Sequence, residues 1–401
     1  MEKNEKFSRP RLFTTAFILL PSRLFLLLAA CILLVIPCTP AKADSASGRK
    51  IVSIVFDDSW SMSTENRYSN ANYAMQAFIA LLDEEDELYV VYMSDVMRAI
   101  QADPSNTDPA GLAVRIGLED PQAGADQVRA KPWNGAGTPY SSVQVGYNEL
   151  FNHPDPESST SYYLVVMSDG GFMDDVTNST AIETGRVQAL FESFAQKPMP
   201  NGTMLNTYYL AIGNEAVPLT DRPDLNFHAF TTTDGLSMIR AIGQMADMIS
   251  GRYRLDPSEI LQTAGNVVSV TSPLPLRNIA FLSQGRAANV AQILGPDGVS
   301  YPITRNVTLS PDAYNGDASL FGDAILADNG AENMPSGTYT VTFTSDIDLS
   351  SLTVMFEPAL SYELVFSTQG IEIPKEAVGG LLEGQELTVS GRVVETGTQN
   401  P

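Results

Sequence analysis

An aspartate and two serines at alternate positions are the residues of this chain best suited to holding a metal ion. They stand in the segment Asp57-Asp58-Ser59-Trp60-Ser61, directly after the apolar run 51–56. One carboxylate and two hydroxyls within a single tight turn form an oxygen ligand set that suits a hard divalent cation. Asp and Ser are also ordinary turn and helix-cap residues, so the interpretation depends on what accompanies them.

Two further segments carry residues of the same chemistry. A Gly-rich loop at 132–140 presents Thr138 just before Pro139, a residue that suits the first position of a helix. Asp169 follows the apolar run 159–167 and precedes two glycines. In open α/β sheets the carboxyl ends of the strands are where ligands bind. We therefore expect Asp57, Ser59, Ser61, Thr138 and Asp169 to meet at one edge of a sheet.

The order of these motifs resembles the von Willebrand factor A (vWA) domain and its metal-ion-dependent adhesion site (MIDAS). The resemblance covers about half the chain, residues 49–252, and implies a Rossmann-like, doubly wound domain. It implies Mg²⁺ or Mn²⁺ in octahedral coordination, with Ca²⁺ less suited. The serines would be direct ligands, Thr138 a direct or water-mediated one, and the aspartates would act largely through ordered waters. The ion would keep much of its charge and accept an acidic side chain from a protein ligand.

Three neighbouring positions need separate interpretation. Residue 60 is Trp where the family usually has Gly, so its ring either covers the rim of the site and adds apolar contact for a ligand, or turns inward as core. We expect Asp58 to be a solvated neighbour and not a ligand. Asp174 and Asp175 are interpreted as surface turn residues.

The surrounding pattern predicts the elements that position these residues. Apolar runs at 51–56, 88–93, 159–167, 205–212 and 227–231 predict strands. Helical spacing of apolar residues predicts helices between them, one with its buried face at Met75, Phe78, Ile79 and Leu82. The acidic run 83–87 is interpreted as a solvated turn. Strands alternating with helices predict a mostly parallel sheet that is covered on both faces.

The pattern changes after residue 255. Alternating apolar residues, as at Tyr339, Val341 and Phe343, with turn signals between them, predict an antiparallel, immunoglobulin-like β-sandwich over 255–366. Residues 367–401 are expected to begin a further β module or to form a tail. The domain organisation is then a vWA domain at 49–252, a sandwich and this last segment.

The first 43 residues are predicted to be a signal peptide. A basic segment precedes the apolar run 24–38, and Ala41-Lys42-Ala43 fits a cleavage site. The alternative is a retained membrane anchor, although neither apolar half reaches the roughly 20 residues of a spanning helix. Both cysteines, Cys31 and Cys38, lie in this segment, so the mature chain is expected to have no disulfide.

The charge balance restricts the partners. The formal net charge is −23, and removing six basic and two acidic residues with the signal peptide makes it −27. Such a surface repels nucleic acid and anionic lipid. We therefore expect no nucleic-acid partner, and no direct lipid binding by the mature chain unless the first segment is retained as an anchor.

These features favour an exported binding or adhesion protein, extracellular or on a bacterial cell surface, that captures a protein ligand through a divalent cation. The alternative is a scaffold or sensor subunit of a surface complex with a structural metal site. We do not expect an enzyme, because the ligand set lacks the histidines and clustered carboxylates that activate water, and no general base stands out.

Overall fold

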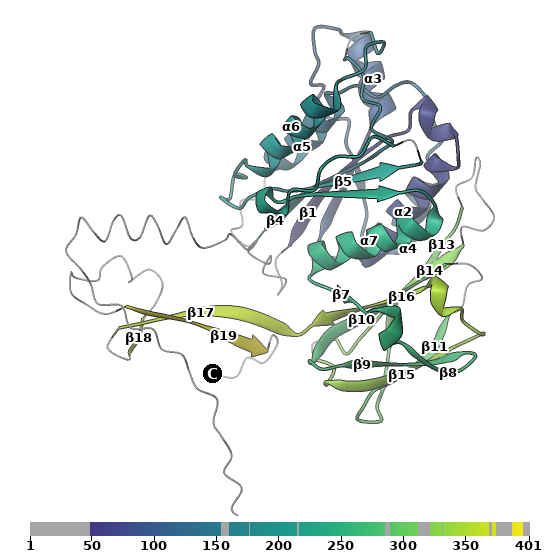
Figure 1. Ribbon diagram of the computed structural model, residues 1–401, viewed down its shortest axis with the longest axis vertical. Helices are drawn as coiled ribbons and strands as arrows, with labels where there is room; N and C mark the ends of the chain where they lie inside the picture. Colours follow the sequence, from purple (N-terminus) through teal and green to yellow (C-terminus); the bar gives the residue numbers. More distant parts are fainter. Residues whose placement is uncertain are drawn as a thin grey trace, which may run out of the picture. The chain divides into compact units, whose positions relative to one another are not determined.

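The computed structural model describes residues 49–153, 160–175, 177–214, 216–284, 289–311, 321–330, 332–368, 371–373 and 387–395. The expected signal peptide lies outside these residues. The described residues form two compact units, 49–359 and 360–395 (Figure 1). Within them, no helix combines the length and apolar character needed to cross a membrane.

The first part of the larger unit is built on a six-stranded sheet in the order β3-β2-β1-β4-β5-β6. Its strands are β1 (Lys50–Phe56), β2 (Glu87–Tyr92), β3 (Val114–Ile116), β4 (Ser161–Ser168), β5 (Asn206–Ile212) and β6 (Phe227–Thr232). All neighbours pair in parallel except β2 and β3. The central strands read as apolar runs because both faces of the sheet are covered.

Helices cover both faces of this sheet. They are η1 (Trp60–Ser63), α2 (Arg67–Leu81), α3 (Met93–Ala102), α4 (Pro121–Arg129), α5 (Ser142–Phe151), α6 (Thr184–Ala195), η2 (Pro223–Leu225) and α7 (Gly235–Ser250). Side chains of α2, α4 and α7 share a core with Val52 and Ile54 of β1, whereas those of α3, α5 and α6 share a core with Ile51 and Val55. The two groups of helices lie on opposite faces of the sheet (Figure 1). The predicted doubly wound α/β architecture is confirmed.

The predicted β-rich region is also confirmed, as two antiparallel sheets in the orders β13-β14-β10-β16-β7 and β12-β11-β15-β9-β8. Their strands are β7 (Tyr253–Arg254), β8 (Leu261–Ala264), β9 (Val267–Ser272), β10 (Leu276–Gln284), β11 (Val290–Leu294), β12 (Ser300–Tyr301), β13 (Ile303–Leu309), β14 (Gly322–Asp328), β15 (Gly337–Phe343) and β16 (Leu352–Pro358), with short 3₁₀ turns η3 (Pro257–Glu259) and η4 (Leu349–Ser351). Tyr339, Val341 and Phe343 lie in the core between the sheets, as their alternation predicts.

The smaller unit is a three-stranded antiparallel sheet in the order β18-β17-β19. Its strands are β17 (Leu360–Thr368), β18 (Ile371–Ile373) and β19 (Thr388–Glu395). The alternation at 362–366 therefore belongs to this unit, and the sandwich ends at residue 359 and not at the expected 366. Alternation identifies a strand, but it cannot identify the sheet that the strand joins. Of the expected last segment, only 367–368, 371–373 and 387–395 are described.

Helix α2 lies between the α/β sheet and the sandwich. The predicted buried face is present, but every residue of the helix except Asn70 is buried. One continuous apolar core joins α2 to residues of β10, β13, β14 and β16. Gln76 of α2 also exchanges two hydrogen bonds with the backbone of Ser310, at 2.9 and 3.1 Å. The amphipathic pattern thus underestimates the burial, because a second domain covers the outer face.

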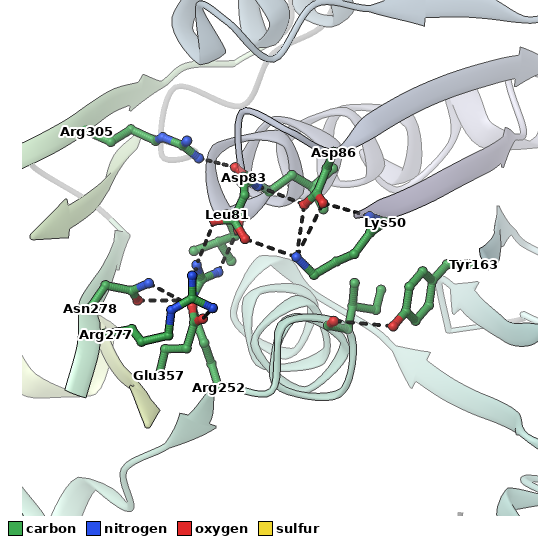
Figure 2. A network of polar contacts seen from close by, with 12 residues as sticks. Lys50, Leu81, Asp83, Asp86, Tyr163, Arg252, Arg277, Asn278, Arg305 and Glu357 are labelled. Atoms are coloured by element: carbon green, nitrogen blue, oxygen red, sulfur yellow. Dashed lines mark hydrogen bonds and ion pairs between the residues drawn. The ribbon is translucent and has the colours of Figure 1, made fainter. Parts of the chain in front are cut away.

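Buried charges join the two domains at the end of α2 (Figure 2). Arg252, which is fully buried, donates to Leu81 O (2.6 Å) and to Asn278 Oδ1 (3.2 Å). One of its terminal nitrogens lies 3.1 Å from Glu357 Oε2 as an ion pair, without hydrogen-bond geometry. Arg305 donates to the carbonyls of Ala80 and Leu82. These cations satisfy helix carbonyls that have no partner within the helix.

Lys50 extends this network to the acidic run. Its Nζ lies 3.0 Å from Asp83 Oδ2 and 3.2 Å from Asp86 Oδ2. Burial raises the pKa of Asp83, but the charges of Lys50 and Arg252 outweigh burial and hold that pKa below its ordinary value. Glu84 and Glu85 are exposed, whereas Asp86 is buried. The acidic run 83–87, expected to be a solvated turn, is therefore solvated only at Glu84 and Glu85, while Asp86 is buried.

Replacing Arg252 tests this junction. In Arg252→Met, Glu357 and Asp83 lose a buried counter-ion, so we expect a loss of about 3 kcal/mol in the free energy of unfolding, measured by urea denaturation. Arg129→Ala is the control: Arg129 pairs with Asp126 on the exposed side of α4 at 2.9 Å, and its loss should cost less than about 1 kcal/mol. Equal effects in the two variants would contradict the role given to Arg252.

Candidate metal site

The candidate site begins where β1 ends. Phe56 pairs with Met167 of β4, and the Asp57 amide donates to Met167 O at 2.9 Å, so the ends of the two strands lie side by side. Asp57 is fully buried. Its Oδ1 accepts the Ser59 amide proton (2.9 Å) and its Oδ2 accepts the Ser168 hydroxyl proton (2.6 Å). Each oxygen keeps one further lone pair for a water or an ion.

The two serines converge in the turn that follows. Ser59 precedes η1 and Ser61 lies within it, and their Oγ atoms are 3.0 Å apart. Ser59 is buried while Ser61 is exposed. The pair therefore presents two neutral oxygen donors at the boundary between the protein and solvent.

Asp169 lies just beyond the end of β4 and is paired with a cation. Its Oδ2 is 3.2 Å from Nη1 of Arg67, the first residue of α2, and both side chains are 7% exposed. Its Oδ1 accepts the Gly171 amide proton at 3.2 Å. Gly170 has a φ of +83°, and a Cβ there would come within 2.5 Å of the Tyr209 hydroxyl, so the turn requires glycine. Asp169 is held by contacts on both oxygens.

Thr138 is positioned by the loop that follows Asp169. Its Oγ1 donates to Gly171 O (2.5 Å), and its carbonyl accepts the Met173 amide proton (2.9 Å). Asn178 Oδ1 accepts the Thr138 amide proton at 3.2 Å. Asp175, expected to be a surface turn residue, accepts the Ser141 amide proton at 2.7 Å and so fixes the segment that leads into α5. The three expected segments therefore meet at one edge of the sheet.

The charges of this site are unbalanced in the absence of a cation. Burial, and secondly the charge of Asp169, raise the pKa of Asp57 to about 7. Two buried carboxylates with hydroxyls beside them fit a divalent cation, which would relieve their repulsion. Both carboxylates already accept protein donors, which suits the water-mediated role that the vWA resemblance implies for them. Arg67 offsets one of the two negative charges.

Asp58 differs from its expected solvated position. Its side chain is fully buried and turned toward α3, where Oδ1 accepts the Ser94 amide proton at 2.8 Å. Burial raises its pKa to about 6, and the hydrogen bond from Ser94 opposes the rise in part. The residue thus binds an N–H group in the first turn of α3, where a carboxylate is favoured.

Sequence reasoning missed four residues that hold the site. Arg67 and Ser168 contact the two aspartates, Asn178 contacts Thr138, and Trp133 Nε1 donates to Ser59 O at 2.7 Å. Ser168 stands next to Asp169, and Trp133 stands in the Gly-rich loop, so both were within the motifs. Arg67 and Asn178 lie outside them, and only the fold brings them to the site.

The rest of the described chain offers other polar groups but no comparable site. None of its His, Cys, Asp and Glu side chains gather in threes that could hold a metal. A hollow of about 730 Å³ lies at the opposite end of the sheet, lined in part by Arg49, Glu87 and His153. There the Glu87 carboxylate is already paired with His153 Nε2 at 3.1 Å, as well as with Arg49. This hollow does not include the expected metal residues.

The chain is similar in structure to several solved proteins. A von Willebrand factor type A protein from Catenulispora acidiphila is 13% identical with a TM-score of 0.33, over 87% of this chain and 66% of that one. The pilus adhesin SpaC from Lactobacillus rhamnosus GG is 10% identical with a TM-score of 0.35, over 87% and 52%.

A third structure, proximal thread matrix protein 1 from the mussel byssus, has a zinc-occupied MIDAS motif. It is 15% identical with a TM-score of 0.32, over 51% of this chain and 46% of that one. The chain thus spans between about half and two thirds of these proteins. Its sequence matches no protein-family model and no curated protein.

The buried charge of Asp57 predicts an unusual pH dependence. Its pKa of about 7 in the folded protein lies above its ordinary 3.8, so in chelator its ionisation lowers stability as the pH rises from about 4 to 7. Asp57→Asn removes this cost. In chelator at about pH 8 we expect the variant to be more stable by up to about 4 kcal/mol, and at about pH 4 equally stable, by urea denaturation.

The control is Asp126→Asn, which changes an exposed carboxylate of α4 and should leave the stability unchanged at both pH values. A variant at position 57 that is less stable than the wild type in chelator at about pH 8 would contradict this electrostatic account.

Proposed function

We propose that this protein is an exported binding or adhesion protein whose α/β domain captures a protein ligand through a divalent cation held by Asp57, Ser59, Ser61, Thr138 and Asp169. The observation that carries the proposal is the pair of buried aspartates at the ends of β1 and β4, beside two hydroxyls 3.0 Å apart. Mg²⁺ and Mn²⁺ suit this set best, and Ca²⁺ suits it less because it prefers more carboxylate ligands.

The five residues would contribute to cation binding in different ways. Ser59 and Ser61 would offer their hydroxyl oxygens directly, and Thr138 directly or through water. Asp57 and Asp169, already occupied by protein donors, would orient bound waters. When bound, the cation supplies a positive charge that accepts a carboxylate from the ligand. A chain with a net charge of −23 needs such a bridge, since it repels an acidic partner elsewhere.

The second candidate is a scaffold or sensor subunit with a structural metal site. The feature that favours it is the continuous core between the α/β domain and the sandwich, which makes the two a single rigid support. A structural ion stabilises the folded state, so a chelator should then lower the melting temperature. An unchanged melting temperature would count against this candidate. We do not propose an enzyme.

Metal titration tests the leading proposal. Calorimetric titration with Mg²⁺ and Mn²⁺ should give saturable one-to-one binding by the wild type, with loss of that binding in Asp57→Ala and Asp169→Ala, because each variant removes one of the two charges that attract the ion. Circular dichroism should show that both variants remain folded. Asp126→Ala serves as the exposed control and should bind as the wild type does. Unchanged binding in the position 57 or 169 variant would exclude the proposed site.

Arg67 is expected to lower the affinity of the site for a divalent cation, whereas the two aspartates raise it. Its guanidinium lies 3.2 Å from Asp169, so it repels the cation. Arg67→Gln removes that repulsion, and we expect Mn²⁺ to bind about tenfold more tightly in the same titration.

Glu65→Gln is the matched control, because Glu65 pairs with Arg67 at 2.9 Å from a side chain that is 44% exposed. Its removal should weaken Mn²⁺ binding only slightly, since solvent screens its charge. Weaker binding in Arg67→Gln would instead mean that Arg67 serves mainly to position Asp169.

A further inference from the structure

Trp60 stands on the outside of the metal loop. It lies between Ser59 and Ser61, and it is 70% exposed, the highest fraction among the exposed large apolar side chains of the described residues. The sequence left open whether the Trp60 ring covers the rim of the site or turns inward as core. Its exposure shows that the ring does not turn inward. An aromatic ring of this size exposed beside a polar site is the kind of side chain that dominates binding energy at protein interfaces.

The ring is held in place although it faces solvent. It packs on Trp133, with ring centroids 5.0 Å apart and an angle of 51° between the planes. Trp133 is itself fixed by its hydrogen bond to Ser59 O and by packing against the core. Gly135, with a φ of +73°, lets the loop approach Trp133 closely, since a Cβ there would lie only 3.1 Å from that ring. A pre-ordered ring loses little entropy when a ligand covers it.

The position of the ring limits what can cover it. Neighbouring residues of a peptide are 3.8 Å apart at Cα, so a ligand whose carboxylate reaches the metal loop brings its next one or two side chains over Trp60. Apolar contact adds binding energy that does not depend on charge, so it is not weakened by the repulsion between this acidic chain and an acidic partner.

We propose that Trp60 and Trp133 form an apolar anchor that selects protein ligands in which an aromatic or large aliphatic residue stands within two positions of the metal-binding acidic residue. The inference rests on the proposed function, because it requires a ligand carboxylate at the cation.

Tryptophan fluorescence offers a direct test, because Trp60 and Trp133 are the two tryptophans of the chain. The first step is a titration with Mn²⁺ alone, which quenches fluorescence when it binds near these rings. The second step, in saturating Mg²⁺, compares acetyl-Gly-Glu-Phe-Gly-amide with acetyl-Gly-Glu-Ser-Gly-amide, two probes of equal charge. Acetyl-Gly-Gln-Phe-Gly-amide, which lacks the carboxylate, and methyl glucuronide, an acidic sugar, are the comparison ligands.

We expect the Phe probe to bind about tenfold more tightly than the Ser probe to the wild type, and the Gln probe to bind weakly. In Trp60→Ala the ratio of the two affinities should fall to near one, with Mn²⁺ affinity unchanged. Trp60→Phe should keep most of the preference. Leu261→Ala, which removes a 64% exposed side chain from the sandwich, should behave as the wild type.

The outcomes separate the inference from the proposed function. Absence of Mn²⁺ binding would overturn the proposed function itself. If Mn²⁺ binds but the protein binds the Phe and Ser probes equally well, or binds neither of them, the apolar anchor alone would be overturned. Tighter binding of methyl glucuronide than of the Phe probe, lost in Trp60→Ala, would show that the rings select a sugar and would also overturn the inference.

Discussion

Helix α2 is the element on which both halves of the larger unit depend, because it is buried on all sides. Its first residue, Arg67, is paired with Asp169 at the candidate metal site. The backbone carbonyls of its last turn accept hydrogen bonds from Arg252, at the link between the two domains, and from Arg305 of the sandwich. A helix end leaves carbonyls without partners, and here the link between the domains and the sandwich each supply a donor. The sandwich therefore completes the α/β domain and is more than a spacer attached to it.

Buried charges at both ends of α2 are also paired with partners from other parts of the fold. In a strongly acidic chain, cations are buried where carboxylates are also buried: Lys50 and Arg252 at one end of α2 and Arg67 at the other. At the junction the charges are balanced by fixed partners. At the site, Arg67 balances only one of two aspartates, and the proposal of an exchangeable ion there rests on this remaining imbalance.

The sequence was sufficient to predict the elements that carry the site, because apolar runs and polar turn residues are local signals. It placed Asp57, Ser59, Ser61, Thr138 and Asp169 in segments that the fold brings to one edge. It could not predict the burial of Asp58, which depends on where α3 begins, or the role of Arg67, which depends on a contact across 102 positions. It also assigned 360–366 to the wrong sheet, since strand patterns carry no record of their partners.

The chain enters and leaves the sandwich at neighbouring points. Arg252 immediately precedes β7, Glu357 lies near the end of β16, and these two strands are antiparallel neighbours with Tyr253 opposite Phe356. A force applied between the α/β domain and the residues after Pro358 would therefore cross the short β7–β16 pairing and the Arg252–Glu357 contact, in parallel with the core that α2 shares with the sandwich. In mechanical terms, the buried ion pair and the β7–β16 pairing would share such a force with the apolar core around α2.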